Sequence, residues 1–209
     1  SEIITLSKSK NSMKMFSFFL ILILISGCSS PPAPNRQVYL LNSDAPLITV
    51  KNSEIEKVVV LDKIQLADHL KRPNLVMQIE GNQLYYSDLD LWAENLQNGI
   101  HDTMLAWLNK HAKATRFVAY DSPEANLGQE HLIVSVQYFM PTDQGTVISS
   151  GQYWRTGNGR TGTGKNEQSV SMHTFSFTSA LTQEGYRHSV ALLAEQLSQL
   201  SSQIVSDFE

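Results

Sequence analysis

The sequence predicts a single α+β domain in which a mixed or antiparallel sheet carries two amphipathic helices on one face. Short runs rich in β-branched and aromatic residues recur along the chain, and two longer segments repeat apolar residues every three or four positions. Both helical stripes must be buried, and one face of a sheet can offer them a common core.

Short strands and tight connections are predicted in the first part of the domain. The tripeptide Glu-Gly-Asn at 80–82 stands between two apolar runs and is typical of a hairpin turn. Residues 65–73 are expected to form one turn of helix that ends before Pro73, because proline restricts the residue before it. The strands predicted up to residue 120 comprise 37–41, 58–61, 75–79, 83–86 and 116–120.

The first long helix is predicted to begin at Ser87 and to continue to about His111. Ser87 and Asp90 are spaced like a capping box, and Asp88 would place negative charge at the positive end of the helix dipole. One continuous apolar stripe supports the helix. Its members are Leu89, Trp92, Leu96, Ile100, Met104, Trp107 and Leu108.

Three antiparallel strands in a meander are predicted next, followed by a second helix. Leu132, Val134 and Val136 alternate with polar residues, which gives the first of these strands one buried face, and Pro141 is expected to end it. The elements of the meander are strands 132–140, 147–154 and 170–177, a turn at 142–145 and a loop at 156–168. Thr182 is expected to cap the helix, whose stripe comprises Tyr186, Val190, Leu193, Leu197, Leu200 and Ile204.

A secretory signal peptide is predicted ahead of the domain, over residues 1–27. A basic patch precedes an almost uninterrupted apolar run from Met15 to Ile25, and small residues follow it. The run is too short to span a bilayer, which needs about 20 apolar residues. Translation is expected to start at Met13, and residues 1–12 are interpreted as a non-native or upstream extension.

Cys28, the only cysteine of the chain, is predicted to be the site of lipid attachment. The segment Ile25-Ser26-Gly27-Cys28 resembles the lipobox of bacterial lipoproteins, in which the thiol is acylated and cleavage leaves the cysteine as first residue. A lone cysteine in an exported chain has no disulfide partner, and each buried acyl methylene contributes about 0.8 kcal/mol to membrane binding. The alternative is an ordinary core cysteine after a buried apolar helix.

Residues 28–36 are predicted to form a short tether, and residues 37–209 the folded domain. The tether is small, polar and rich in proline, as a linker between lipid and domain should be. Ser29 follows the cysteine in place of an aspartate, and in many Gram-negative bacteria this favours sorting to the outer membrane. Cleavage before Cys28 leaves 182 of the 209 residues, which suffices for one domain with a good core.

The charge balance argues against nucleic acid as a partner. Three of the 16 basic residues and one of the 20 acidic residues precede Cys28, so the mature chain carries a formal charge of −6. A nucleic-acid binder would instead present a basic stripe. With Cys28 acylated, no thiol remains for a disulfide or a cysteine zinc site.

Motifs that could suggest catalysis are expected to be structural. Residues 157–162 match one phosphate-binding pattern, and residues 159–166 nearly match a second, in which Asn166 replaces the magnesium-binding serine or threonine. A strand pattern follows both where a helix should begin. We interpret them as a hairpin loop. Neither a helical zinc motif nor a serine nucleophile elbow occurs, so we expect no catalytic residues, no metal and no cofactor, and the chain is not predicted to be an enzyme. The six histidines are His69, His101, His111, His131, His173 and His188, of which His131 and His173 are expected on solvent faces of strands.

Several weak motifs follow one another in a fixed order in the central segment, residues 58–108. A strand leads to Leu-Lys-Arg-Pro at 70–73, then to a hairpin with Asn82 at its turn, then to Trp92 and Leu96 at a predicted helix start. This order resembles the signature region of the PqiC-type proteins, which are ABC-type transport auxiliary lipoproteins. The later strand SGQYW, the closing helix and the lipobox match as well, so the resemblance covers essentially the whole mature chain.

The resemblance implies a non-catalytic role in lipid transport. PqiC-type proteins are anchored in the outer membrane and face the periplasm. They work with an inner-membrane component and an MCE-domain tunnel protein that carry lipid between the two membranes, and they are tied to envelope integrity. Contact is expected through exposed sheet edges or through a surface that forms a homo-oligomer. The glycine-rich loop at 157–164 is longer than usual for the family, so its contacts are not carried over.

Two other functions are considered. A stand-alone lipoprotein would hold a lipid or a peptidoglycan fragment, and a deep apolar cavity would favour it, whereas a solid core would favour docking. A secreted hydrolase would need a histidine, an acid and a serine within hydrogen-bond reach in one pocket. Tyr85, Tyr86, Tyr153 and Trp154 are candidates for a contact surface, although core packing is the more common use of such aromatics.

Overall fold

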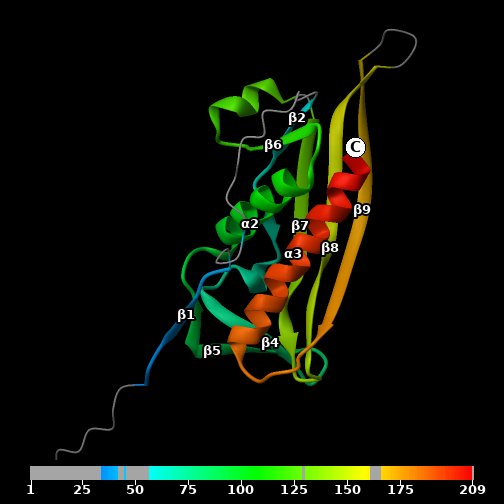
Figure 1. Ribbon diagram of the computed structural model, residues 1–209. Helices are drawn as coiled ribbons and strands as arrows, with labels where there is room; N and C mark the ends of the chain where they lie inside the picture. The colour runs from blue at the N-terminus through cyan, green and yellow to red at the C-terminus, as the bar shows by residue number, and fades with distance from the viewer. Residues whose placement is uncertain (1–33, 42–44, 46–56, 129, 161–165, 209) are drawn as a thin grey trace, which may run out of the picture. The chain divides into compact units, whose positions relative to one another are not determined.

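The structure is a computed structural model that describes residues 34–41, 45, 57–128, 130–160 and 166–208 (Figure 1). Contacts divide the chain into Ser1–Asn35 and Arg36–Glu209, and every element described below belongs to the second unit. The predicted signal peptide, Cys28 and most of the tether lie outside the described residues. Of the helices in the described part, none is long and apolar enough to cross a membrane.

Nine strands and two helices make up the described part of the domain, together with two short 3-10 turns. The strands are β1 Gln37–Tyr39, β2 Lys57–Leu61, β3 Gln65–Leu66, β4 Asn74–Ile79, β5 Gln83–Trp92, β6 Thr115–Ala119, β7 Glu130–Thr142, β8 Thr146–Arg160 and β9 Asn166–Ala180. The helices are α2 Leu96–His111 and α3 Tyr186–Phe208, and the 3-10 turns are η1 Asp68–Leu70 and η2 Pro123–Leu127.

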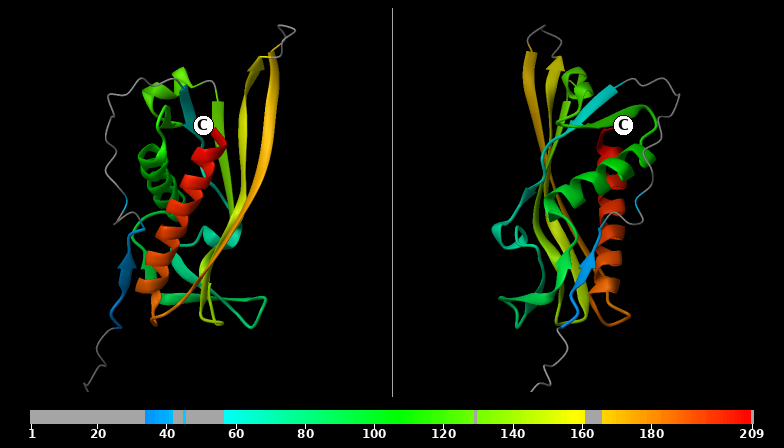
Figure 2. Two further views of the ribbon diagram at one scale, coloured as in Figure 1. Left: turned by 45° about the vertical axis from the view of Figure 1, so that its right-hand side comes forward. Right: turned by 90° about the vertical axis from the view of Figure 1, so that its left-hand side faces the viewer.

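The sheet is organised around β7. This strand pairs in parallel with β2, β3 and β4 and antiparallel with β8, which in turn pairs with β9. One path through the sheet runs β1-β5-β4-β7-β2-β6, and both α2 and α3 lie over the same face (Figures 1 and 2). The predicted fold class, an α+β domain with a mixed sheet and two helices on one face, is confirmed.

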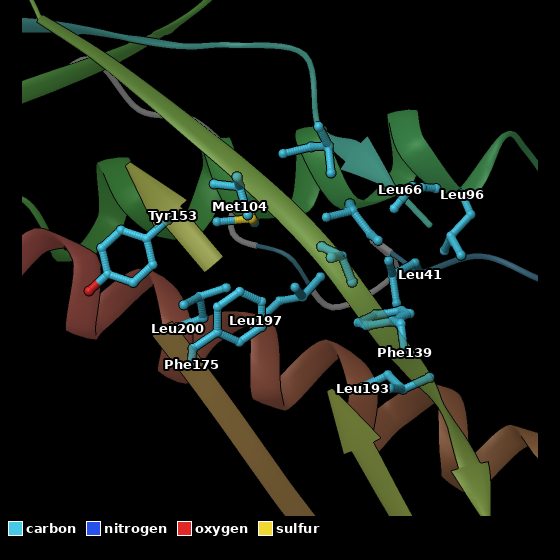
Figure 3. Close-up of a cluster of buried hydrophobic side chains, with 14 of the residues drawn as sticks. Leu41, Leu66, Leu96, Met104, Phe139, Tyr153, Phe175, Leu193, Leu197 and Leu200 are labelled. Atoms are coloured by element: carbon cyan, nitrogen blue, oxygen red, sulfur yellow. The ribbon is translucent and has the colours of Figure 1, made fainter. Parts of the chain in front are cut away.

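A single apolar core fills the space between the sheet and the helices. Alternating residues of β7, Leu132, Val134 and Val136, are buried there and meet the stripe of α3, which is buried as predicted from Val190 to Ile204. Figure 3 shows Met104 of α2 and Leu197 and Leu200 of α3 facing aromatic side chains of the meander. Those labelled aromatics are Phe139, Tyr153 and Phe175.

The predicted start of the first helix at Ser87 is wrong. The helix begins at Leu96, where the side chain of Asn95 accepts the N–H of Gln97 at 2.9 Å. The Ser87 hydroxyl does accept the N–H of Asp90 at 3.0 Å, as a cap would, but this bond closes an irregular turn within β5. Pairing with β4 on one side and β1 on the other holds this stretch extended, so tertiary contacts override the local helix signal.

The β7–β8–β9 meander is confirmed, but its strands are longer than predicted. Pro141 lies within β7 opposite Val147 instead of ending the strand, and on its other side β7 meets β4 only at Thr142, so little ladder is lost through the missing N–H. The predicted loop at 156–168 is also wrong in extent, because β8 and β9 remain paired as far as Arg160 and Asn166. Residues 161–165, at the centre of the phosphate-loop-like motif, lie outside the described residues.

The last helix begins at Tyr186, four residues after the predicted cap. The Thr182 hydroxyl instead lies 3.1 Å from Nε2 of His188. Gly185 has a φ of +95°, a backbone conformation that residues with a side chain rarely adopt. The connection from β9 therefore needs a glycine-dependent bend before the helix can lie back over the sheet.

Gly151 tests how closely the meander is packed. A Cβ at this position would lie 2.0 Å from the backbone oxygen of Ser135 and 3.0 Å from the ring of Phe175. We expect Gly151→Ala to lower the free energy of unfolding by about 1–3 kcal/mol, because backbone cannot move aside as a flexible side chain can. Urea denaturation measures this, with Ser150→Ala as the control on the same strand; equal stability of the two variants would contradict the packing.

Candidate interaction surfaces

Of the aromatic side chains predicted to lie in a contact surface or in the core, some are buried and others are exposed. Tyr153 is buried, and its hydroxyl donates to Asp207 of α3. Burial and this bond raise the pKa of Tyr153 to about 12. Tyr86 and Trp154 are half-buried, and Tyr85 is exposed on β5. Only Tyr85 is thus fully available to a partner, and it was not distinguishable from Tyr86 by sequence pattern.

The histidines are dispersed over the fold. His131 lies on the helix-free face of β7 beside Asp62 at 3.0 Å, which agrees with the prediction. His173 was predicted on a solvent face, but it stacks on the buried Tyr153 and lies 3.5 Å from Asp207 beneath α3. Within the part of the chain that the structure describes, no group of three or more histidine, aspartate or glutamate side chains could hold a metal ion.

A charged clamp holds the end of α3 against the sheet. Glu130 at the start of β7 accepts two bonds from Arg155 of β8, at 2.7 and 3.1 Å, and lies 3.2 Å from Lys57 of β2. The two cations also donate to the last carbonyls of the helix, Lys57 to that of Phe208 and Arg155 to that of Asp207. Positive charge at a helix C-terminus satisfies carbonyls that have no partner within the helix.

The clamp is a structural site, and periodicity could not reveal it. Its residues are far apart in the sequence and come together only when β2 and β8 flank β7. Burial alone would raise the pKa of Glu130, but the bonds from Arg155 and the charge of Lys57 outweigh it and lower that pKa. The side chains of Lys57, Glu130 and Arg155 are thus bonded to one another and to the end of α3.

Among the described strands, β1, β6 and β9 each have an unpaired edge, and that of β9 is the longest. β9 pairs only with β8, so its outer backbone groups face away from the sheet over 15 residues. From Ser169 to Ala180 the only titratable side chain on this edge is His173, although edge strands are usually protected by charge or proline. An edge of this kind can accept a strand from another chain.

The helix-free face of the meander adds an apolar patch next to this edge. Val170 and Met172 of β9 are 61% and 58% exposed, Met172 is opposite Trp154 of β8, and Trp154 is opposite Ile133 of β7. Trp154 and Ile133 are half-buried. We refer to Ile133, Trp154, Val170 and Met172 as the meander patch.

Among the surface pockets, three have linings that lie wholly in the described part of the chain. One of about 210 Å³ lies at His101 and Tyr120, one of about 200 Å³ lies between Trp107 of α2 and Ala194 of α3, and one of about 340 Å³ lies between β1 and α3. Sites for drug-sized ligands occupy roughly 300–1,000 Å³. None of the three could enclose a lipid with several acyl chains.

The clamp predicts a specific dependence of stability on pH. Glu130→Gln should lower the free energy of unfolding by about 1–3 kcal/mol at neutral pH, because Arg155 and Lys57 lose a charged acceptor. A lowered pKa in the folded state means that the contribution is complete above the ordinary glutamate value of 4.5 and is lost as the pH falls through the folded-state pKa.

Urea denaturation between about pH 7 and pH 3 tests this expectation. The difference in stability between the natural chain and Glu130→Gln should shrink as the pH falls. Glu124→Gln is the matched control: Glu124 pairs with Arg116 at 2.7 Å but is far more exposed, so its effect should stay below about 1 kcal/mol. A Glu130→Gln effect that did not change with pH would contradict an ionic clamp.

Two solved structures share this fold. A crystal structure of an uncharacterized protein superposes with a TM-score of 0.68 at 19% identity, covering 84% of this chain and all of the other. Protein XCC0632 from Xanthomonas campestris gives a TM-score of 0.56 at 14% identity, with 81% of this chain and 92% of that chain covered. At such identities the likeness shows the fold alone. No curated protein matches the sequence.

The family assignment rests on the sequence. The model of the ABC-type transport auxiliary lipoprotein component family matches residues 39–205, which is nearly all of the folded domain and agrees with the resemblance found in the central segment. The chain belongs to the ABC-type transport auxiliary lipoprotein component family.

Proposed function

We propose that this protein is a non-catalytic docking subunit of an MCE-type, Pqi-like system that moves lipid between two membranes. In this role it is attached to the outer membrane, faces the periplasm and contributes to envelope integrity. Its partners are an MCE-domain tunnel protein and an inner-membrane component. Membership of a transport auxiliary lipoprotein family supports the role.

The filled core supports a docking function over the storage of a ligand. Residues of β2, β7, α2 and α3 form one contiguous buried cluster, and three pockets lined by described residues lie on the surface outside it. A stand-alone lipoprotein that held a lipid or a peptidoglycan fragment would need a deep apolar cavity. The core therefore favours a protein that functions through contacts on its surface.

The β9 edge and the meander patch are the surface that this proposal assigns to the tunnel protein. The outer backbone groups of β9 can pair with an added strand, and the apolar patch beside the edge adds side-chain contacts. Little charge must be desolvated there, because His173 is the only titratable side chain from Ser169 to Ala180.

A charge placed in the patch should weaken capture of the partner without unfolding the domain. We expect Met172→Lys to reduce recovery of an MCE-domain protein at least about tenfold, since a lysine would have to be desolvated in the contact. The measurement is affinity purification from detergent-solubilised envelope with quantitative mass spectrometry.

Leu127→Lys is the matched control for this experiment. Leu127 is 68% exposed on η2, so the substitution adds the same charge to an equally exposed apolar position. It should leave recovery unchanged. Equal recovery by Met172→Lys and Leu127→Lys would assign the contact elsewhere, and repeated failure of the natural chain to recover any MCE-domain protein would count against the proposed function.

Lipid attachment at Cys28 is the second part of the proposal. The lipobox-like segment that ends at Cys28 and the family's character as lipoproteins support it. We expect Cys28→Ser to leave the domain folded but to move it from the membrane fraction to the soluble periplasmic fraction. Fractionation after a salt wash measures this, with circular dichroism as the control for folding. A Cys28→Ser chain that stays with the membranes would show that another contact holds it.

A further inference from the structure

The connections at one end of the domain are bound to one another. The N–H of Glu80, in the β4–β5 turn, donates to Oδ2 of Asp143 in the β7–β8 turn at 2.9 Å, and the N–H of Asp143 donates to the carbonyl of Gln78 at 3.0 Å. The N–H of Leu181, between β9 and α3, donates to the carbonyl of Gly145 at 2.9 Å. Two hairpin turns and the start of α3 therefore meet at this end, as Figures 1 and 2 show.

The domain also begins at this end. β1 pairs in parallel with the last part of β5, with Gln37 opposite Asp90, and the hydroxyl of Tyr39 donates to Oδ1 of Asp90 at 3.0 Å. Residues Gln37–Leu41 and Arg187 of α3 line the same surface pocket. These residues of β1, β5 and α3 are thus close neighbours. We call the surface formed by β1, the β4–β5 hairpin and the start of α3 the anchor end.

Exposed apolar side chains are concentrated on the anchor end. Five of the ten large apolar residues that are exposed in the described part of the chain lie on β5 or within and just after β1. They are Val38, Leu40, Leu84, Tyr85 and Leu89, and their exposed fractions run from 37% to 66%. Tyr85 is the exposed tyrosine among them, while Tyr39, Tyr86 and Tyr186 of the anchor end are half-buried. Tyrosine combines an apolar ring with a polar tip and is enriched where a membrane meets water.

The charged side chains of the anchor end do not form a basic patch that would bind an anionic membrane. The exposed acids Glu80, Asp88, Asp143 and Glu184 are set against the exposed cations Arg36, Arg72 and Arg187. A nearly neutral surface with exposed aliphatic side chains and one exposed tyrosine fits the boundary between headgroups and acyl chains better than it fits a charged protein.

The length of the preceding chain favours the same surface. Cys28 and Arg36 are separated by eight peptide units, which span at most about 30 Å. The 23 residues of α3 span about 35 Å away from the anchor end. The tether leaves the domain at the anchor end and is shorter than α3, so it can bring the anchor end to a bilayer more readily than the far end of α3.

We propose that the anchor end rests on the bilayer that holds the lipid of Cys28, with Leu84, Tyr85 and the exposed residues of β1 in the headgroup region. The inference depends on the proposed lipid attachment. Tethering keeps the domain at a high effective concentration near the membrane, so a weak apolar contact is enough to orient it. The β8–β9 hairpin, whose strands run away from this end, then points from the membrane toward a partner (Figure 1).

Site-specific labelling of the acylated full chain in phosphatidylcholine vesicles tests this orientation. Because Cys28 is the only natural cysteine and its thiol is acylated, a cysteine introduced by Tyr85→Cys is the only one that an environment-sensitive fluorophore can label. Leu127→Cys provides the control, since η2 precedes β7 and lies at the opposite end of that strand from the β7–β8 turn. Leu84→Cys provides a second probe should the first variant fold poorly.

Emission from the label at position 85 should shift to shorter wavelength on reconstitution. A quencher confined to the lipid phase should reduce the emission from position 85 at least about twofold more than the emission from position 127. This difference should persist in 1 M salt, because the contact is apolar. If the chains float with the vesicles but the labels at 84 and 85 are as exposed to water as the label at 127, the proposed orientation is wrong, while the lipid attachment stands. Acyl-free chains that float as well as acylated ones would overturn the lipid attachment at Cys28 instead.

Discussion

The pairing of β7 with four other strands is the constraint on which the rest of the domain depends. Its side chains alternate between a face buried under the helices and a face without helices, so a slip of one residue would move Leu132, Val134 and Val136 out of the core. The strands β2, β3, β4 and β8 are aligned by their register with β7. The positions of both sheet ends, and of the connections that leave them, follow from that register.

The helix α3 ties together the two ends of the meander. It starts where Leu181 is bound to the β7–β8 turn, and it ends where Lys57 and Arg155 bind its last carbonyls. Between these points its stripe covers one face of β7, β8 and β9, so that face cannot serve a partner. Within the meander, the opposite face with the meander patch and the outer edge of β9 remain free.

This division of surfaces gives a physical basis for an auxiliary subunit in transport. The described core is filled by side chains, so the proposed role assigns the contribution of this domain to its surface. An anchor end on the bilayer would leave the meander pointing outward; strands of 15 residues reach roughly 50 Å. A free and nearly uncharged edge would then be presented at a distance from the membrane, where a tunnel protein that bridges two membranes can be met.

Local periodicity in the sequence was enough to predict the α+β class, the three-stranded meander and the buried stripe of α3, because each depends on neighbours within a few residues. Sequence also identified the family and, as a prediction outside the described residues, the lipid site at Cys28. Only the tertiary structure decided that Ser87 belongs to a strand, that Pro141 lies inside β7, and that Lys57, Glu130 and Arg155 form a clamp. Each of these depends on which distant strands pair, and pairing is chosen by the burial of the whole core rather than by any short segment of the chain.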